Sequence, residues 1–178
     1  MLTFEDINTN NWKRVVSSVM KSELTYKKSI RTSKMGYAQI LIDGDAIGKL
    51  AFFDNTYVGN IIAYPPTNAE MIDYKMNKPE FSNIKYVYLF NFVIANGYRG
   101  EGIGSKLLKE FLITAQELGY DRVIGHFRPN GSLAAFKKFG ATEIEVCRNW
   151  ENTKEDYIFC EIDLKKLKLI EPTITVRN

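Results

Sequence analysis

The most informative stretch of the sequence is residues 84–119, IKYVYLFNFVIANGYRGEGIGSKLLKEFLITAQELG. Its first part, residues 84–95, is apolar on both faces of a strand, which predicts a central position in a sheet. Four glycines follow within residues 97–104. Glycine at that density costs backbone entropy, which indicates that bare backbone is needed there. Residues 105–118 then carry an apolar stripe with helical spacing, and Gly119 is a typical C-terminal cap for that helix.

Two common phosphate-binding motifs do not fit this glycine turn. A G-x-G-x-x-G fingerprint counted from Gly100 would need a third glycine at Ser105. A Walker-type loop would need Gly-Lys-Ser or Gly-Lys-Thr, but Gly104 is followed by Ser105 and Lys106. The pattern that remains is R-x-x-G-x-G from Arg99 to Gly104, at a strand-to-helix junction. Free backbone N–H groups and the helix dipole favour an anion at such a junction, so the turn predicts an anion site.

The chain before this stretch predicts helices and then strands. Residues 10–33 have the apolar spacing of one or two helices. Residues 37–43, 46–54 and 56–64 predict three strands of an antiparallel meander, because Asp-Gly-Asp and Asp-Asn between them are turn-forming. Residues 65–83 mix prolines, asparagines and charges without periodicity, which predicts a mobile connection on the substrate side.

The chain after this stretch predicts three more strands and a short helix. Residues 121–127 form the next strand, and the order strand, turn, helix, strand predicts a right-handed crossover with the two strands parallel. Residues 132–139 predict a short helix. Residues 142–148 and 155–164 predict two closing strands.

Composition places the chain among ordinary globular proteins. Residues 1–178 fit a single domain, with 45% apolar and 25% charged residues. A net charge of +3 is too small to predict a nucleic-acid partner. The N-terminus lacks the layout of a signal peptide, and no apolar run approaches the ~20 residues of a membrane helix, so we expect a cytoplasmic protein without a membrane partner. Cys147 and Cys160 have no metal-ligand companions, and we expect reduced thiols and no metal site.

Residues 92–108, FVIANGYRGEGIGSKLL, resemble the signature of the GNAT superfamily, the acetyl-CoA dependent N-acetyltransferases. That signature is Gln or Arg, two residues, Gly, one residue, then Gly or Ala, after an apolar strand and opening an amphipathic helix. The match falls on Arg99, Gly102 and Gly104. Residues 130–144, NGSLAAFKKFGATEI, look like the family's second element, a short helix that precedes a glycine.

The resemblance implies an α+β fold of the GNAT type. Its central sheet would be mixed, mostly antiparallel, with about seven strands splayed in the middle and about four flanking helices. Amides of the glycine turn would hold the pyrophosphate of acetyl-CoA, the acyl donor. The pantetheine arm would lie along the 84–95 strand like an extra strand, with a backbone N–H near Ile94 as oxyanion donor. The implied donor-binding residues are Phe92, Val93, Ile94, Arg99, Gly100, Glu101, Gly102, Ile103, Gly104, Ser105, Asn130 and Phe136.

The proton chemistry departs from the family pattern. Phe136 stands where the family often has an acidic tyrosine, so water, Ser132 or a substrate-side tyrosine would replace it. Residues 84–95 hold no carboxylate base. His126, the only histidine, has a suitable intrinsic pKa for a base but is equally compatible with a packed role, and residues 65–83 offer further carboxylates. A site without a strong base suits an amine of low pKa.

The leading hypothesis is therefore an enzyme that moves the acetyl group of acetyl-CoA to a primary amine by direct attack in a ternary complex. The acids of residues 65–83 favour a cationic acceptor. The alternative is a module that binds CoA with little or no catalysis. Transfer of a longer acyl chain is a third reading, which the bulky Phe90, Phe92 and Phe136 argue against. The closing strands are able to pair across a dimer, so both a monomer and a homodimer fit.

Overall fold

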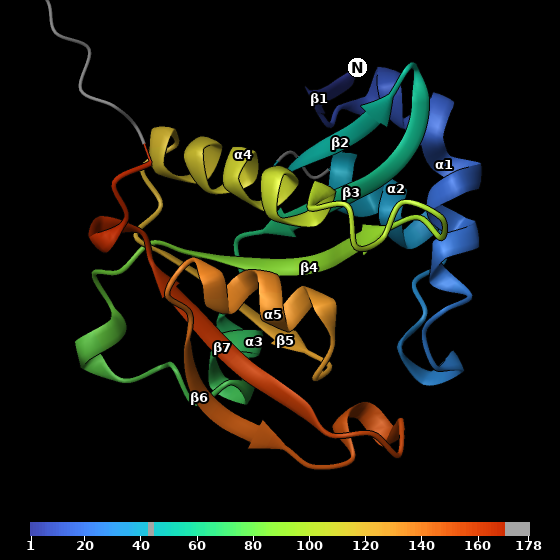
Figure 1. The fold of residues 1–178 in the computed structure, drawn as a ribbon. Helices are drawn as coiled ribbons and strands as arrows, with labels where there is room; N and C mark the ends of the chain where they lie inside the picture. The colour runs from blue at the N-terminus through green and yellow to red at the C-terminus, as the bar shows by residue number, and fades with distance from the viewer. Residues whose placement is uncertain (43–44, 170–178) are drawn as a thin grey trace, which may run out of the picture.

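A seven-stranded mixed sheet organises the protein (Figure 1). The computed structural model describes residues 1–42 and 45–169. The order across the sheet is β1 (Leu2–Asp6), β2 (Ile47–Phe53), β3 (Thr56–Tyr64), β4 (Tyr86–Ile94), β5 (Arg122–Phe127), β7 (Tyr157–Asp163) and β6 (Thr142–Cys147). Every neighbouring pair is antiparallel except β4 and β5, which run parallel. The expected GNAT-type α+β fold is thus confirmed. The two strands expected to run parallel, over residues 84–95 and 121–127, are β4 and β5.

The described residues form seven strands and five α-helices. The strands are β1 (Leu2–Asp6), β2 (Ile47–Phe53), β3 (Thr56–Tyr64), β4 (Tyr86–Ile94), β5 (Arg122–Phe127), β6 (Thr142–Cys147) and β7 (Tyr157–Asp163). The helices are α1 (Thr9–Glu23), α2 (Lys34–Ile42), α3 (Asn68–Asp73), α4 (Ile103–Glu117) and α5 (Gly131–Lys138), with short 3-10 turns η1 (Lys28–Ile30), η2 (Pro79–Phe81), η3 (Trp150–Asn152) and η4 (Leu164–Lys166). None of these helices combines the length and apolar composition that crossing a bilayer requires.

The strand predicted over residues 37–43 is wrong. Residues 34–42 form α2, and Asp43 lies outside the described residues. A short apolar run cannot be assigned to strand or helix by periodicity alone, and here Tyr37 is buried against α1 rather than in the sheet. The missing strand is β1, which pairs antiparallel with β2 at the sheet edge. The strand number is correct only because these two errors cancel.

Helices cover both faces of the sheet. Neighbouring residues of β2 point to opposite faces, as strand geometry requires. Ala51 belongs to the core beneath α4, and Leu50 and Phe52 belong to the core beneath α1 and α2. Helices α4 and α5 pack beside each other on the first face, and α1 and α2 lie side by side on the other (Figure 1).

The sheet splits between its two central strands. Strands β4 and β5 pair only where Tyr86–Tyr88 meets Arg122–Ile124, although β4 continues to Ile94. The register of β3 against β4 shifts at the same place, leaving Phe90 as one extra residue in β4. Such a bulge bends a strand and increases its twist, which turns the end of β4 away from β5. The predicted splay is confirmed.

The core role of α4 is testable by comparing two leucines of one helix segment. Leu107 is a residue of α4 that is fully buried in the core, and Leu118, which caps the C-terminal end of α4, is 48% exposed. We expect Leu107→Ala to lower the free energy of unfolding by about 2–5 kcal/mol, because it leaves a cavity in the core. Leu118→Ala should cost less than about 1 kcal/mol. Urea unfolding measures both, and equal losses would contradict this placement of α4.

Candidate functional site

One cavity of about 800 Å³ follows the split in the sheet. Its wall includes the glycine turn before α4, the unpaired part of β4 and the start of α5 on one face of the sheet. On the other face the wall consists of the end of α1, the segment that follows it, and a group of aromatic side chains. The cavity therefore connects the two faces of the sheet through the gap between β4 and β5.

The glycine turn presents backbone rather than side chains. Gly102 precedes α4 with a φ of +74°, a left-handed conformation that favours glycine, and no side chain caps the helix start. A Cβ at Gly102 would meet nothing within 4 Å, so there is room in front of these amides. At Gly104 a Cβ would lie 3.4 Å from Cγ1 of Ile94 and 3.6 Å from Cζ of Phe92, which are ordinary van der Waals distances, so the start of α4 packs against side chains of β4.

The end of β4 offers N–H groups to the gap. The N–H of Ala95 donates to the carbonyl of Val58 in β3 at 2.8 Å. Because peptide groups alternate along a strand, the N–H groups of Ile94 and Phe92 point the other way, toward the cavity. Arg99 Nε donates to the carbonyl of Ile94 at 2.9 Å, which holds the arginine at the cavity edge beside the glycine turn.

Most of the residues predicted for the site line this one cavity. They are Phe92, Val93, Ile94, Arg99, Gly100, Gly102, Gly104, Ser105, His126, Asn130 and Ser132. Three predicted residues do not: Glu101 is exposed, and Ile103 and Phe136 are buried in the core. The Phe136 ring packs 4.5 Å from the Phe127 ring, because it lies on the inner side of α5.

Ser132 stands at the start of α5 and is tied to Asn130. The Asn130 side chain caps this helix by accepting the N–H of Ser132 at 3.0 Å. It also accepts the Ser132 hydroxyl at 2.6 Å. The hydroxyl proton of Ser132 is therefore directed at Asn130 and would have to turn to serve a reacting group.

His126 lies between two aromatic rings. Its ring stacks 3.8 Å from Trp150 and 4.4 Å from Phe159, and Nδ1 is 3.1 Å from the hydroxyl of Tyr88. Burial lowers the pKa of His126 to about 3, although the residue as a whole is only half-buried. At neutral pH the imidazole is uncharged and is a weak base.

Several tyrosines around the cavity were not singled out from the sequence. Burial is the largest cause that raises the pKa of Tyr26, Tyr64, Tyr74 and Tyr88 above the usual value, so these hydroxyls stay protonated. They come from segments far apart in the chain, and no local spacing announces them. Tyr74 is the member of the 65–83 connection that lines the cavity.

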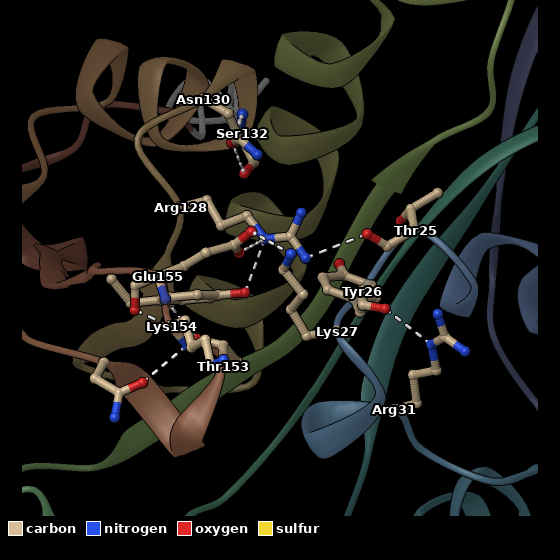
Figure 2. A network of polar contacts seen from close by, with 12 residues as sticks. Thr25, Tyr26, Lys27, Arg31, Arg128, Asn130, Ser132, Thr153, Lys154 and Glu155 are labelled. Carbon is tan, nitrogen blue, oxygen red and sulfur yellow. Dashed lines mark hydrogen bonds and ion pairs between the residues drawn. The ribbon is translucent and has the colours of Figure 1, made fainter.

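Arg128 ties together the segments that close the cavity (Figure 2). Its Nε donates to the Tyr157 hydroxyl at 2.8 Å and lies 3.2 Å from a Glu155 oxygen, an ion pair without hydrogen-bond alignment. Its Nη2 donates to the carbonyl of Thr25 at 3.3 Å, and Lys27 pairs with Glu155 at 3.3 Å. The end of β5, the loop before β7 and the segment after α1 are thereby joined.

Glu23, at the end of α1, is the cavity residue that sequence reasoning missed most clearly. Its side chain is 4% exposed and lines the cavity. Oε2 accepts the N–H of Thr32 at 2.8 Å, and Oε1 accepts the hydroxyl of Tyr37 and the side-chain amide of Asn91 at 3.2 Å. In sequence it is an ordinary helix-end glutamate, and only the packing of α1 against β4 reveals its position.

The acidic, histidine and cysteine side chains of the described residues are scattered rather than clustered. Residues 1–42 and 45–169 contain no group of three or more His, Cys, Asp or Glu side chains that could hold a metal ion. Cys147 and Cys160 are free thiols, and they stand opposite Tyr157 and Glu143 respectively rather than opposite each other.

Comparison with known proteins places the chain by family and by fold. The family model described as Acetyltransferase (GNAT) family matches residues 12–141. A comparison with curated protein sequences gives no match. Solved structures of similar fold include the ribosomal-protein-S18-alanine N-acetyltransferase from Escherichia coli, with a TM-score of 0.68, 15% identity, and coverage of 92% of this chain and 94% of that chain.

Two plant structures also have folds similar to that of this chain. Arabidopsis thaliana NAA60 in complex with acetyl-CoA has a TM-score of 0.70 and 15% identity, covering 93% of this chain and 99% of that chain. Arabidopsis thaliana Naa50 in complex with the bisubstrate analogue CoA-Ac-MVNAL has a TM-score of 0.63 and 21% identity, covering 90% and 97%. At these identities the likeness concerns the fold.

The environment of His126 predicts an unusual titration. Because it is the only histidine, a single imidazole signal should stay in the neutral form from pH 8 to pH 5 in an NMR titration. The folded pKa lies below the ordinary 6.5, so the unfolded chain binds a proton that the folded chain does not. Stability from this group is complete above pH 6.5 and is lost toward pH 3, by at most about 1.4 kcal/mol per pH unit.

The control for this titration is His126→Phe, which keeps an aromatic ring in the stack and cannot bind a proton. Its stability between pH 6.5 and pH 5 should decline less than that of the wild type in urea unfolding. Titration of the folded imidazole near pH 6.5 would refute the described environment.

Proposed function

Since the chain belongs to the GNAT acetyltransferase family, we propose that it transfers the acetyl group of acetyl-CoA to a primary amine by direct attack in a ternary complex. The observation that carries the proposal is the continuous cavity. It joins the glycine turn on one face of the sheet to the aromatic and carboxylate groups on the other. Direct transfer needs both substrates in one space, and this cavity reaches both faces.

The donor half of the proposal rests on backbone groups. The amides from Gly102 to Ser105 would hold the pyrophosphate at the start of α4, with Arg99 adding positive charge. The pantetheine arm would pair with the free edge of β4 through the N–H groups of Phe92 and Ile94. A backbone N–H near Ile94 that the arm leaves free would donate to the thioester oxygen as negative charge develops on it.

The acceptor half of the proposal concerns the attack of the amine and the proton transfers that accompany it. A neutral amine attacks the carbonyl carbon, the C–N bond forms, and the C–S electron pair leaves on sulfur. The thiolate gains a proton and the attacking nitrogen loses one. We propose that a protonated tyrosine or Ser132 gives its proton to sulfur, and that the nitrogen's proton passes, directly or through water, back to that hydroxyl. His126, with a pKa of about 3, is better suited to hold the Tyr88 hydroxyl than to remove the amine's proton.

The second candidate function is a module that binds CoA without efficient catalysis. It is favoured by Phe136, which stands where the family often has a tyrosine and is buried in the core. Release of free thiol from acetyl-CoA with a panel of amines separates the two functions. Turnover supports the acetyltransferase, and binding of acetyl-CoA without any turnover supports the module.

The role of Gly102 is testable against a matched glycine. Gly102 and Gly119 both have a φ of +74° and open space at the Cβ position, but Gly119 lies past the far end of α4. Alanine at either position should cost about 1 kcal/mol of stability. We expect only Gly102→Ala to raise the KM for acetyl-CoA, by at least about tenfold, because its Cβ would enter the space in front of the amides. Steady-state kinetics of both variants decide, and an unchanged KM in Gly102→Ala would rule out the pyrophosphate assignment.

The absence of a strong base predicts a preference between amines. At pH 7.5 about a third of an α-amine is neutral, against about a thousandth of a lysine side chain. A peptide with a free α-amine should therefore be acetylated roughly two- to three-hundredfold faster than an N-terminally blocked peptide with one lysine. The ratio of the two acetylation rates should decrease as the pH rises toward 10, because a larger share of the lysine side chain becomes neutral. Turnover measured on this pair from pH 7 to pH 10 tests the expectation, and faster acetylation of the lysine at pH 7.5 would contradict it.

A further inference from the structure

The carboxylate of Glu23 is the end point of a chain of buried hydrogen bonds. The Tyr57 hydroxyl donates to the Asn60 side-chain oxygen, and the Asn60 amide donates to the Asn91 oxygen at 2.6 Å. The Asn91 amide then donates to Glu23 Oε1 at 3.2 Å. Asn60 and Asn91 are 0% and 3% exposed. Each donor in this chain points toward Glu23, so the donors strengthen one another in stabilising a negative charge there.

Two further donors act on the same carboxylate from α2 and the segment before it. The Tyr37 hydroxyl donates to Oε1, and the N–H of Thr32 donates to Oε2. Tyr37 is fully buried and does not line the cavity, whereas Glu23 and Asn91 do. Tyr37 therefore holds the carboxylate from the core side, while its other two donors, Thr32 and Asn91, hold it at the wall of the cavity, which Glu23 itself lines.

This buried charge has no cationic partner in the part of the chain that the structure describes. No ion pair there involves Glu23. The arginines of neighbouring segments are directed elsewhere: Arg31 donates to the carbonyls of Tyr26 and Leu24, and Arg128 pairs with Glu155. Removing a carboxylate from water without a counter-charge is costly, and hydrogen bonds offset only part of that cost. A cation entering the cavity would supply the missing charge.

The wall on the same face of the sheet is aromatic. The Tyr64 ring lies 5.7 Å from Tyr88, and Tyr74 stacks on Tyr88 at 5.2 Å. His126 and Trp150 continue this wall, and all five line the cavity. Flat rings bind apolar groups and also attract cations. A ligand that satisfies both features carries a positive charge and an adjoining apolar or aromatic group.

We propose that Glu23 binds the amino group of the acceptor, and that the acceptor is a primary ammonium with an apolar or aromatic group next to it. This inference rests on the proposed function for the identity of the cation as the acceptor. Glu23 accepts a hydrogen bond from the ammonium group when the acceptor enters. After the ammonium has lost a proton, Glu23 accepts a hydrogen bond from the resulting neutral amine. The aromatic wall contacts the adjoining group.

The first test uses the wild-type protein and the fluorescence of Trp150, which lines the cavity. Trp12, the other tryptophan, is a residue of α1 that is buried in the core, so it supplies a constant background fluorescence. The charged probes are 2-phenylethylamine and the tetrapeptide Phe-Gly-Gly-Gly, which distinguish a free amine from a peptide N-terminus. Their uncharged partners are 2-phenylethanol and the formylated tetrapeptide. At least one charged probe should bind about tenfold or more tightly than its partner, and equal binding in both pairs would overturn the proposal.

The second test compares Glu23→Gln with Tyr37→Phe. Glu23→Gln removes the charge facing the cavity, and we expect it to weaken binding of the charged probe at least about tenfold. Binding of the uncharged partner and the KM for acetyl-CoA should stay within about threefold of the wild type. Tyr37→Phe removes one donor from the same carboxylate on the core side, and it should lower Tm with less than about a threefold effect on probe binding.

The outcomes separate a recognition role from a structural one. If Glu23→Gln binds the charged probe as the wild type does, the proposal is wrong. Equal losses of affinity in Glu23→Gln and Tyr37→Phe would mean that Glu23 only joins α1 to α2 and β4. If Glu23→Gln does not fold, the wild-type comparison of charged and uncharged probes decides. Absence of thiol release from acetyl-CoA with every bound amine would refute the proposed function and leave the Glu23 site standing.

Discussion

The end of the pairing between β4 and β5 is the constraint on which the rest of the structure depends. A parallel pair that stops at Tyr88 and Ile124 leaves the β4 N–H groups that face the gap, those of Phe92 and Ile94, without a strand partner. Backbone groups must be satisfied by something, and a free strand edge accepts an extended ligand as readily as another strand. The bulge at Phe90 maintains the separation by turning β4 away from β5. The cavity exists because of this separation.

The elements around the gap divide the work between the two faces of the sheet. On one face, the glycine turn and the start of α4 present amides and Arg99, which suit the anionic end of a donor. On the other face, α1 and its neighbours present Glu23 and an aromatic wall, which suit a cationic acceptor. In the proposed reaction, opposite charges on opposite sides of one gap would orient the two substrates toward the point where they meet.

The acceptor side is held together by long-range contacts rather than by any single element. Arg128 joins the end of β5 to the loop before β7 and to Thr25. Glu23 joins α1 to α2 and to Asn91 of β4. These ties build the proposed acceptor side from segments that are distant in sequence, in contrast to the proposed donor side, which comes mostly from one continuous stretch.

That contrast explains what the sequence by itself determined. Residues 84–119 carry a strand, a turn and a helix whose side-chain periods and glycine positions are local properties, so the central strand and the helix after it could be predicted from them. The splay was an expectation from the resemblance to the GNAT family. The assignment of residues 37–43 to a strand failed because a short apolar run has no period that separates strand from helix, and burial against α1 decided it. Glu23, the protonated tyrosines and the buried state of His126 were decided only by the tertiary structure. Their chemistry depends on burial and on partners tens of residues away, and no local pattern records either.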